Sequence, residues 1–228
     1  MTNGVILFFL YVPIMTFMAL VLAVVLNSKR VRGFRFFRTL LFIPYIMNIV
    51  AAGFTFRLRL NQKYGLVNLM LGIFNIAPVP WLESVWGSRV SLCLLVIWAR
   101  LGYNMVIMLA GLQTIPGELT EAALIDGAGE FTIFWRIILP IIAPGLTSLG
   151  LIFFMGSWNG FIGPLIYLKS PEHFTLPLII HSLIGPVGRT VYDVQMAASV
   201  ISLIPLLIIF LTFQGRIVEG ITAGAIKG

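Results

Sequence analysis

Long apolar stretches alternate with short polar segments along this chain. A helix needs about 20 predominantly apolar residues to cross the hydrocarbon layer of a membrane. Composition supports such crossings, because 59% of the 228 residues are hydrophobic and only 10% are charged, too few for the surface of a soluble domain. We therefore expect an all-α fold, a polytopic bundle of membrane helices forming a single domain over residues 1–228. Five stretches are apolar enough to span: Val5–Leu26, Thr39–Phe56, Ser91–Gln113, Ile137–Phe154 and Met196–Phe213.

The segment Asn159–His181 is also apolar, but it is interrupted. A polar cluster, Lys169–His173, divides it, and three prolines fall within it: Pro164, Pro171 and Pro177. Irregular backbone at membrane depth is tolerated only where protein or water covers it. The segment therefore predicts re-entrant or interfacial helices, and a sixth crossing is the alternative.

The basic residues indicate which side of the membrane each loop faces. The net charge is +7, but the basic residues are not clustered on one soluble face, so no nucleic-acid partner is expected. Five of them lie in the short loop Asn27–Arg38, which the positive-inside rule marks as cytoplasmic. Alternation then predicts that the N-terminus, Arg57–Val90 and Asn159–Gln195 are outside, whereas the loop 114–137 and the tail 214–228 are cytoplasmic.

The loop 114–137 has the pattern of a helix-turn-helix. Pro116 suits the first turn of a helix, and good helix formers follow as far as Gly127, a residue that favours a left-handed stop. A second helix is expected from about Glu130, with an apolar face formed by Phe131, Phe134, Trp135 and Ile138. Such a unit suits a groove on a partner protein. Packing against its own bundle is the alternative.

The spacing within this loop resembles a family signature. Glu121-Ala122-Ala123 is followed after three residues by Gly127 and after nine more by Ile137-Ile138-Leu139-Pro140. This pattern resembles the EAA motif of permease subunits from ATP-binding-cassette (ABC) importers, where the loop is the coupling helix that docks on the cytoplasmic ATPase. Ala122 and Ala123 would be small enough for close approach. The resemblance implies an ATPase-coupling role for Glu118, Glu121, Ala122, Ala123, Asp126, Gly127, Phe131, Ile137, Leu139 and Pro140.

Further segments resemble carbohydrate permeases of the maltose-importer kind, which work as pairs of different subunits. One partner subunit is resembled by Arg32–Tyr45, Tyr64–Asn68, Pro80–Leu82 and Trp98–Met105. The other is resembled by Gly129–Arg136, Gly156–Asn159, Phe174–Pro177 and Gly220–Gly228. The chain thus reads as a hybrid, with ordinary divergence within one family as the alternative. A heterodimer with a second permease subunit is favoured over a homodimer.

The resemblance implies a type I ABC importer fold and a place in the bacterial or archaeal plasma (inner) membrane, in contact with lipid. The implied function is ATP-driven import of a sugar or a related polyol or sugar phosphate. The implied partners are a cytoplasmic ABC ATPase dimer, a second permease subunit and an extracytoplasmic solute-binding protein. An ATP-independent channel or secondary carrier is the alternative, although the inverted repeats typical of carriers are not seen in the sequence.

Five residues are candidates for the substrate pathway. Arg100 lies in the middle of a predicted span, where a charge must face protein or water. Aromatic and amide side chains suit a sugar site, and the candidates are Tyr103, Asn104, Trp158 and Asn159. Each also has a structural interpretation. Arg100 could pair with a carbonyl or a partner subunit, and Trp158 could belong to an interfacial belt.

The sequence offers no catalytic machinery. It contains no Gly-x-x-x-x-Gly-Lys-Ser/Thr phosphate loop, so ATP would be used by the partner ATPase, and we expect no cofactor on this chain. His173 and His181 are eight residues apart, which matches no metal-ligand spacing. We therefore expect neither an enzymatic activity nor a metal site.

Overall fold

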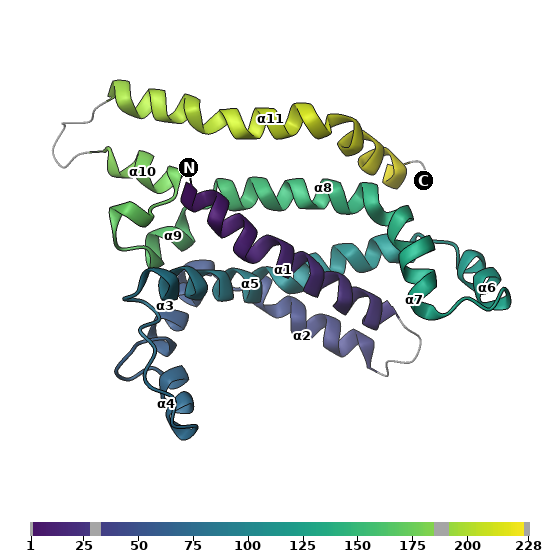
Figure 1. Ribbon diagram of the computed structural model, residues 1–228, viewed down its shortest axis with the longest axis horizontal. Coiled ribbons are helices and arrows are strands. Elements are labelled where there is room, and N and C mark those ends of the chain that lie inside the picture. The colour runs from purple at the N-terminus through teal and green to yellow at the C-terminus, as the bar shows by residue number, and fades with distance from the viewer. Residues whose placement is uncertain (1, 28–32, 185–191, 226–228) are drawn as a thin grey trace.

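A computed structural model describes residues 2–27, 33–184 and 192–225, and the regular structure in these residues is entirely helical. This confirms the all-α prediction. In chain order, the helices are α1 (Thr2–Asn27), α2 (Phe34–Ile46), α3 (Ile49–Arg59), α4 (Leu66–Ile73), α5 (Val85–Gln113), α6 (Gly117–Ile125), α7 (Glu130–Ile133), α8 (Leu139–Trp158), α9 (Ile162–Tyr167), α10 (Leu176–Ser182) and α11 (Tyr192–Ala225) (Figure 1). A π-helical turn, Phe134–Ile138, joins α7 to α8, and a 3₁₀ turn, Pro171–His173, precedes α10.

Four helical stretches in the described residues are long and apolar enough to cross a membrane. They are Thr2–Asn27, Val85–Gln113, Glu130–Trp158 and Tyr192–Gly215. These stretches correspond to four of the five predicted spans. Helix α11 continues beyond its apolar part to Ala225, so most of the predicted tail 214–228 extends the last span as a helix. The final residues, 226–228, lie outside the described residues.

The fifth predicted span, Thr39–Phe56, is not one straight helix. It is divided between α2 and α3, which meet at an angle of 96°. Met47 leaves the helix in an extended conformation, and Asn48 starts the next one, because its side-chain oxygen accepts hydrogen bonds from the backbone N–H groups of Val50 (2.9 Å) and Ala51 (3.3 Å). This is a helix N-cap in the middle of an apolar run. The predicted span is therefore a bent pair of helices, which is the fifth crossing if the two helices traverse the membrane together.

The segment Asn159–His181 contains only short helices. Helix α9 has 6 residues, and α10, which begins within this segment, has 7 residues. A rise of about 1.5 Å per residue makes each far shorter than the roughly 30 Å hydrocarbon layer. The prediction of interrupted, non-spanning helices is confirmed, and neither helix provides the sixth crossing.

The ends of the helices gather in two groups (Figure 1). The N-terminus, α3, α4, α9 and α10 lie at one end of the bundle, whereas α6, α7 and the C-terminal end of α11 lie at the other. This arrangement agrees with the predicted alternation of loops. The basic loop Asn27–Arg38, partly outside the described residues, joins α1 to α2 at the α6 end, so the positive-inside rule identifies that end as cytoplasmic.

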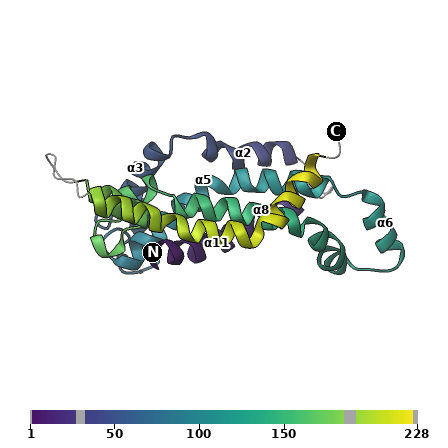
Figure 2. The same cartoon turned by 90° about the horizontal axis from the view of Figure 1, so that it is seen from above.

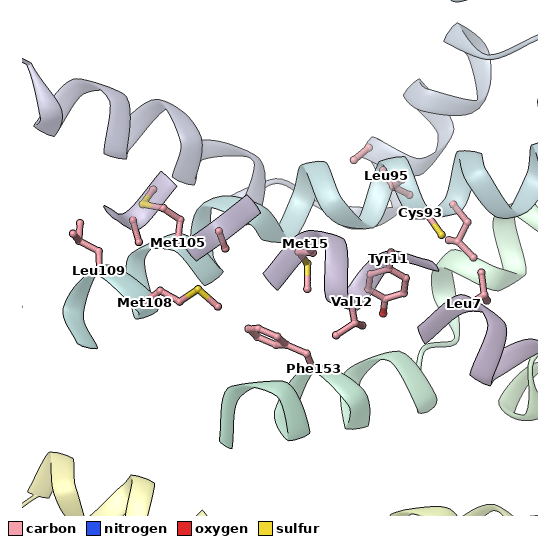
Figure 3. Close-up of a cluster of buried hydrophobic side chains, with 14 of the residues drawn as sticks. Leu7, Tyr11, Val12, Met15, Cys93, Leu95, Met105, Met108, Leu109 and Phe153 are labelled. Atoms are coloured by element: carbon pink, nitrogen blue, oxygen red, sulfur yellow. The ribbon is translucent and has the colours of Figure 1, made fainter. Parts of the chain in front are cut away.

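The core is centred on α5. Helices α1 and α2 lie on two sides of it and both contact it (Figure 2). Ala19 and Ala23 of α1 are completely buried, and such small side chains allow helices to approach closely in a membrane. Tyr11, Val12 and Met15 lie between the α5 side chains and Phe153 of α8 (Figure 3). The spanning parts of α8 and α11 are largely exposed in the single chain, so lipid or another subunit must cover them.

Candidate functional site

The loop 114–137, predicted to be cytoplasmic, is a compact helix-turn-helix. Helix α6 begins directly after Pro116 and carries Glu118 in its first turn, where a carboxylate suits the positive end of the helix dipole. Helix α7 begins at Glu130, as predicted. Both predicted helices of the loop 114–137 are therefore present at the expected places.

Gly127 ends α6 in a left-handed conformation, with φ +81°. Two hydrogen bonds close the end of the helix: Gly127 N–H donates to the carbonyl of Leu124 (3.1 Å), and Ala128 N–H donates to the carbonyl of Ala123 (2.9 Å). This pair of bonds is the Schellman motif, in which a glycine avoids the strain that a Cβ would cause. The glycine of the signature therefore determines the shape of the turn.

Two side chains of the loop are buried. Ala123 and Ile133 have 8% and 3% of their surface exposed, and α6 contacts α7. The other side chains between 114 and 137 are exposed or half-buried. Ala123, expected to allow close approach of a partner, instead lies inside the loop, whereas Ala122 is exposed.

The outer surface of the loop combines acidic and large apolar side chains. Glu118, Glu121 and Asp126 are exposed. Large apolar side chains on the same loop are exposed to between 44% and 86%: Leu119, Leu124, Ile125, Phe131 and Trp135. Leu119, Leu124 and Ile125 were not predicted to belong to this surface. Leu124 and Ile125 lie just before the glycine turn, and this position at the tip of the loop could have indicated that they are exposed.

The loop continues into the membrane through a π-helical turn. The backbone N–H of Leu139 donates to the carbonyl of Phe134, five residues earlier, and Pro140 follows at the start of α8. Proline has no N–H group to donate to a helix hydrogen bond, and the single π-turn keeps the helix continuous up to that position. Ile137, Leu139 and Pro140 of the signature therefore lie in a helical connection, Glu130–Trp158, that joins the loop directly to a membrane span.

A second group of candidate residues lies where α2 meets α5. The ring of Tyr45 stacks on Tyr103, with 4.4 Å between centroids and 10° between planes. The guanidinium of Arg100 lies 5.6 Å from the Tyr45 ring centroid, within cation–π range. Arg100 is exposed and forms no ion pair with the described residues. Tyr45 was not among the residues predicted for the pathway, although its position beside the break at Asn48 could have indicated it.

Close helix packing produces this group. A Cβ on Gly102 of α5 would overlap the carbonyl group of Leu41 in α2, so only glycine permits the observed crossing. Beside it lies an apolar cavity of about 360 Å³, lined by Leu40, Leu41, Ile43, Pro44, Trp98 and Leu101. The site therefore consists of two stacked aromatic rings and one cation beside an apolar hollow.

The other pathway candidates lie elsewhere. Asn104 is 1% exposed, and its amide nitrogen has no hydrogen-bond partner. Trp158 is 5% exposed, and its indole N–H donates to the carbonyl of Ser202 (3.1 Å), which ties α8 to α11. Asn159 is exposed at the end of α8. The structure therefore brings Arg100 and Tyr103 together, and the Trp158 side chain is not available to a substrate in this conformation.

Comparison with known proteins agrees with this architecture. Over residues 1–223 the chain matches the family described as "Binding-protein-dependent transport system inner membrane component". Two similar proteins are permease proteins named for arabinooligosaccharide transport in Halalkalibacterium halodurans. AraQ is 40% identical over 114 residues, 50% of this chain and 40% of AraQ. AraP is 30% identical over 202 residues, 88% of this chain and 64% of AraP.

The chain thus matches about two fifths of the length of AraQ. A solved structure of a bacterial ABC transporter involved in the import of the acidic polysaccharide alginate is similar in fold, with a TM-score of 0.84, 24% identity and coverage of 96% of this chain and 77% of that one. Because the family match covers nearly the whole chain, this multi-pass membrane protein belongs to the binding-protein-dependent transport system inner membrane component family.

Proposed function

We propose that this chain is a permease subunit of an ATP-driven sugar importer in the plasma membrane. The observation that carries the proposal is the α6–α7 loop. It presents apolar and acidic side chains at the cytoplasmic end, carries the EAA spacing, and is joined without a break to the span formed by α8. The name of the similar AraQ protein, a transport permease for arabinooligosaccharides, supports a carbohydrate substrate.

The coupling step follows from the stiffness of this loop. The Schellman turn at Gly127 and the contact between α6 and α7 hold the two helices as one body. The π-turn keeps that body in helical continuity with α8. When a nucleotide closes the ATPase pair, a docked loop moves as a rigid element, and α8 moves with it. Access then changes from one side of the membrane to the other.

The ATPase is a separate subunit in this proposal. Leu124, Ile125 and Phe131 would enter an apolar groove on it, because large exposed apolar side chains mark interaction sites. Glu121 would add a charged contact at the edge of this surface and govern the choice of partner. The coupling residues predicted from the signature thus divide into those that build the loop, such as Ala123 and Gly127, and those that contact the ATPase.

The substrate would contact the Tyr45, Arg100 and Tyr103 group. Sugar rings stack on aromatic faces, and a guanidinium donates hydrogen bonds to hydroxyl or acidic groups. The pathway would be completed by a second permease subunit, because one chain leaves α8 and α11 largely uncovered. A heterodimer is favoured, and a homodimer is the second candidate, since the chain is similar to both AraQ and AraP.

The deciding experiment is reconstitution. The full chain is coexpressed with the candidate ATPase and second permease, purified in detergent, and placed in proteoliposomes with labelled oligosaccharide and the binding protein. Sugar uptake that requires ATP on the side of the vesicle membrane where the ATPase lies supports the proposal. Equal uptake without the ATPase would identify a channel or carrier instead. Two differently tagged copies of the chain test pairing, because recovery of one tag with the other indicates a homodimer.

A further inference from the structure

Helix α4 carries an apolar stripe that the described residues leave largely exposed. Leu66, Leu69, Met70 and Ile73 follow the i, i+3, i+4, i+7 spacing that places side chains on one helix face. Their exposed fractions are 54%, 59%, 62% and 78%, and Phe74, directly after the helix, is 76% exposed. A helix on a water-exposed surface would turn such a stripe inward.

The opposite side of α4 is held by one polar side chain. Asn68 is 8% exposed and takes part in four hydrogen bonds. Its amide donates to the carbonyls of Gln62 (3.1 Å) and Val79 (3.0 Å), while its oxygen accepts from the Val79 N–H (3.1 Å) and the Trp81 indole N–H (2.9 Å). These bonds fix the rotation of α4 about its own axis, so the apolar stripe on its opposite side faces away from the hydrogen-bonded loop.

The same hydrogen bonds fix the depth of α4 relative to the membrane. Asn68 is bonded to Trp81, which lies just before Ser84, the N-cap of the span α5. On the other side, α3 ends at Arg59, shortly before α4 begins. Figure 1 shows α4 leaving the bundle sideways at its outer end. Helix α4 therefore lies level with the outer end of a membrane span.

The residues around α4 suit the boundary between lipid and water. Arg59 and Lys63 are exposed and form no ion pair with the described residues. Tyr64 and Trp86 are 63% and 60% exposed at the same end. Basic and amphipathic aromatic side chains are typical of the headgroup level, where cations meet lipid phosphates.

We propose that α4 is an interfacial helix that lies in the outer leaflet, with its apolar stripe among the acyl chains and Arg59 and Lys63 at the lipid phosphates. The partner is thus a phospholipid surface, not the ATPase, and this inference does not depend on the transported substrate. The helix anchors the outer end of the broken span α2–α3 to the membrane plane. A second permease subunit lying on the stripe is the competing occupant.

Spin labels measure the depth. In the full chain with Cys93→Ser, a label is placed at Ile73→Cys or, as the matched control, at Lys63→Cys. The protein is copurified with its subunits and reconstituted in nanodiscs of phosphatidylethanolamine and phosphatidylglycerol. Collision with oxygen reports lipid exposure, whereas collision with a water-soluble nickel chelate reports water exposure. We expect an oxygen-to-nickel ratio at Ile73 several times that at Lys63.

Two results would overturn the proposal. Equal ratios at both positions would mean that the stripe faces water. Low collision rates with both reagents at Ile73 would mean that protein covers it. Met70→Cys provides a second stripe position with the same expected outcome if the first variant does not assemble. The measurement needs no transport activity, so its result is independent of whether the proposed import function holds.

Discussion

Tyr45 of α2 and Tyr103 of α5 stack almost in parallel, with 4.4 Å between their ring centroids. The two rings come from different spans, and they meet because Gly102 lets the α2 backbone lie directly on α5. Arg100 completes the group from the same helix as Tyr103. The aromatic surface proposed to bind sugar rings thus depends on a packing contact one residue away from it.

The substitution Gly102→Ala tests that dependence. The added Cβ overlaps the Leu41 carbonyl, and such overpacking costs about 1–3 kcal/mol. We expect a lower thermal unfolding midpoint in detergent and a marked loss of sugar uptake. Gly111→Ala, on the same helix with open space around it, is the matched control and should retain both properties. Equal behaviour of the two variants would contradict the close crossing of α2 and α5.

Removal of the Tyr45 ring should weaken sugar binding without affecting assembly with the ATPase. An aromatic pair contributes about 0.5–1.5 kcal/mol beyond its burial. Tyr45→Ala should therefore raise the KM for sugar uptake several-fold while ATPase recovery in a pull-down stays unchanged. Tyr64→Ala, an exposed tyrosine at the outer end, is the control. An unchanged KM for Tyr45→Ala would remove this residue from the pathway.

Charge reversal on the cytoplasmic loop should affect ATPase attachment alone. Glu121 is exposed on α6, in the loop between two spans. Bringing a like charge against a partner surface costs on the order of a few kcal/mol, which corresponds to a loss of about a hundredfold or more in affinity. Glu121→Lys should therefore reduce ATPase recovery in a detergent pull-down, with normal membrane insertion. Glu172→Lys at the opposite end should have no effect, and full recovery with Glu121→Lys would argue against docking through this residue.

Replacement of the turn glycine should uncouple the transporter. A β-branched side chain in a left-handed conformation is strained by about 1–3 kcal/mol, and Gly127 has φ +81°. Gly127→Val should lower ATP-dependent uptake at normal expression levels. Gly127→Asn should be milder, because asparagine tolerates this conformation. Wild-type transport by the valine variant would show that the turn is dispensable.

Cysteine labelling tests the direction of the bundle. In a Cys93→Ser background, a cysteine at Ser28 should react with an impermeant reagent only from the cytoplasmic side, and one at Glu172 only from outside. Inverted and right-side-out vesicles distinguish the two cases. Labelling of both positions from the same side would require a different number of crossings between them.

Much of this architecture could be predicted from local patterns. Apolar runs of sufficient length indicated the spans α1, α5, α8 and α11, and Pro116 and Gly127 bounded α6 because both act through their own backbone. The bend in the second span was not predicted, since the run Thr39–Phe56 is apolar enough to read as one helix. Pro44 near the end of α2 and Asn48 at the start of α3 were the local signals of the break.

Contacts between distant residues could not be predicted. Trp158 donates its N–H to the carbonyl of Ser202, 44 residues further along the chain, and no local pattern indicates that bond. Ala123 belonged to a recognised signature, yet its burial depends on how the chain folds around it and not on its neighbours in sequence. The stacking of Tyr45 on Tyr103 likewise follows from how two helices cross, which periodicity within either helix does not determine.

The small interior of the cytoplasmic loop has a consequence for how transporters diversify. The loop contains two buried side chains and one glycine turn, whereas the surface proposed to meet the ATPase consists of other residues. Under the proposed function, substitutions at Leu124, Ile125 or Phe131 would therefore change which ATPase is recognised while the loop keeps its geometry. Duplicated permeases could in this way share one ATPase or acquire separate ones through surface changes alone.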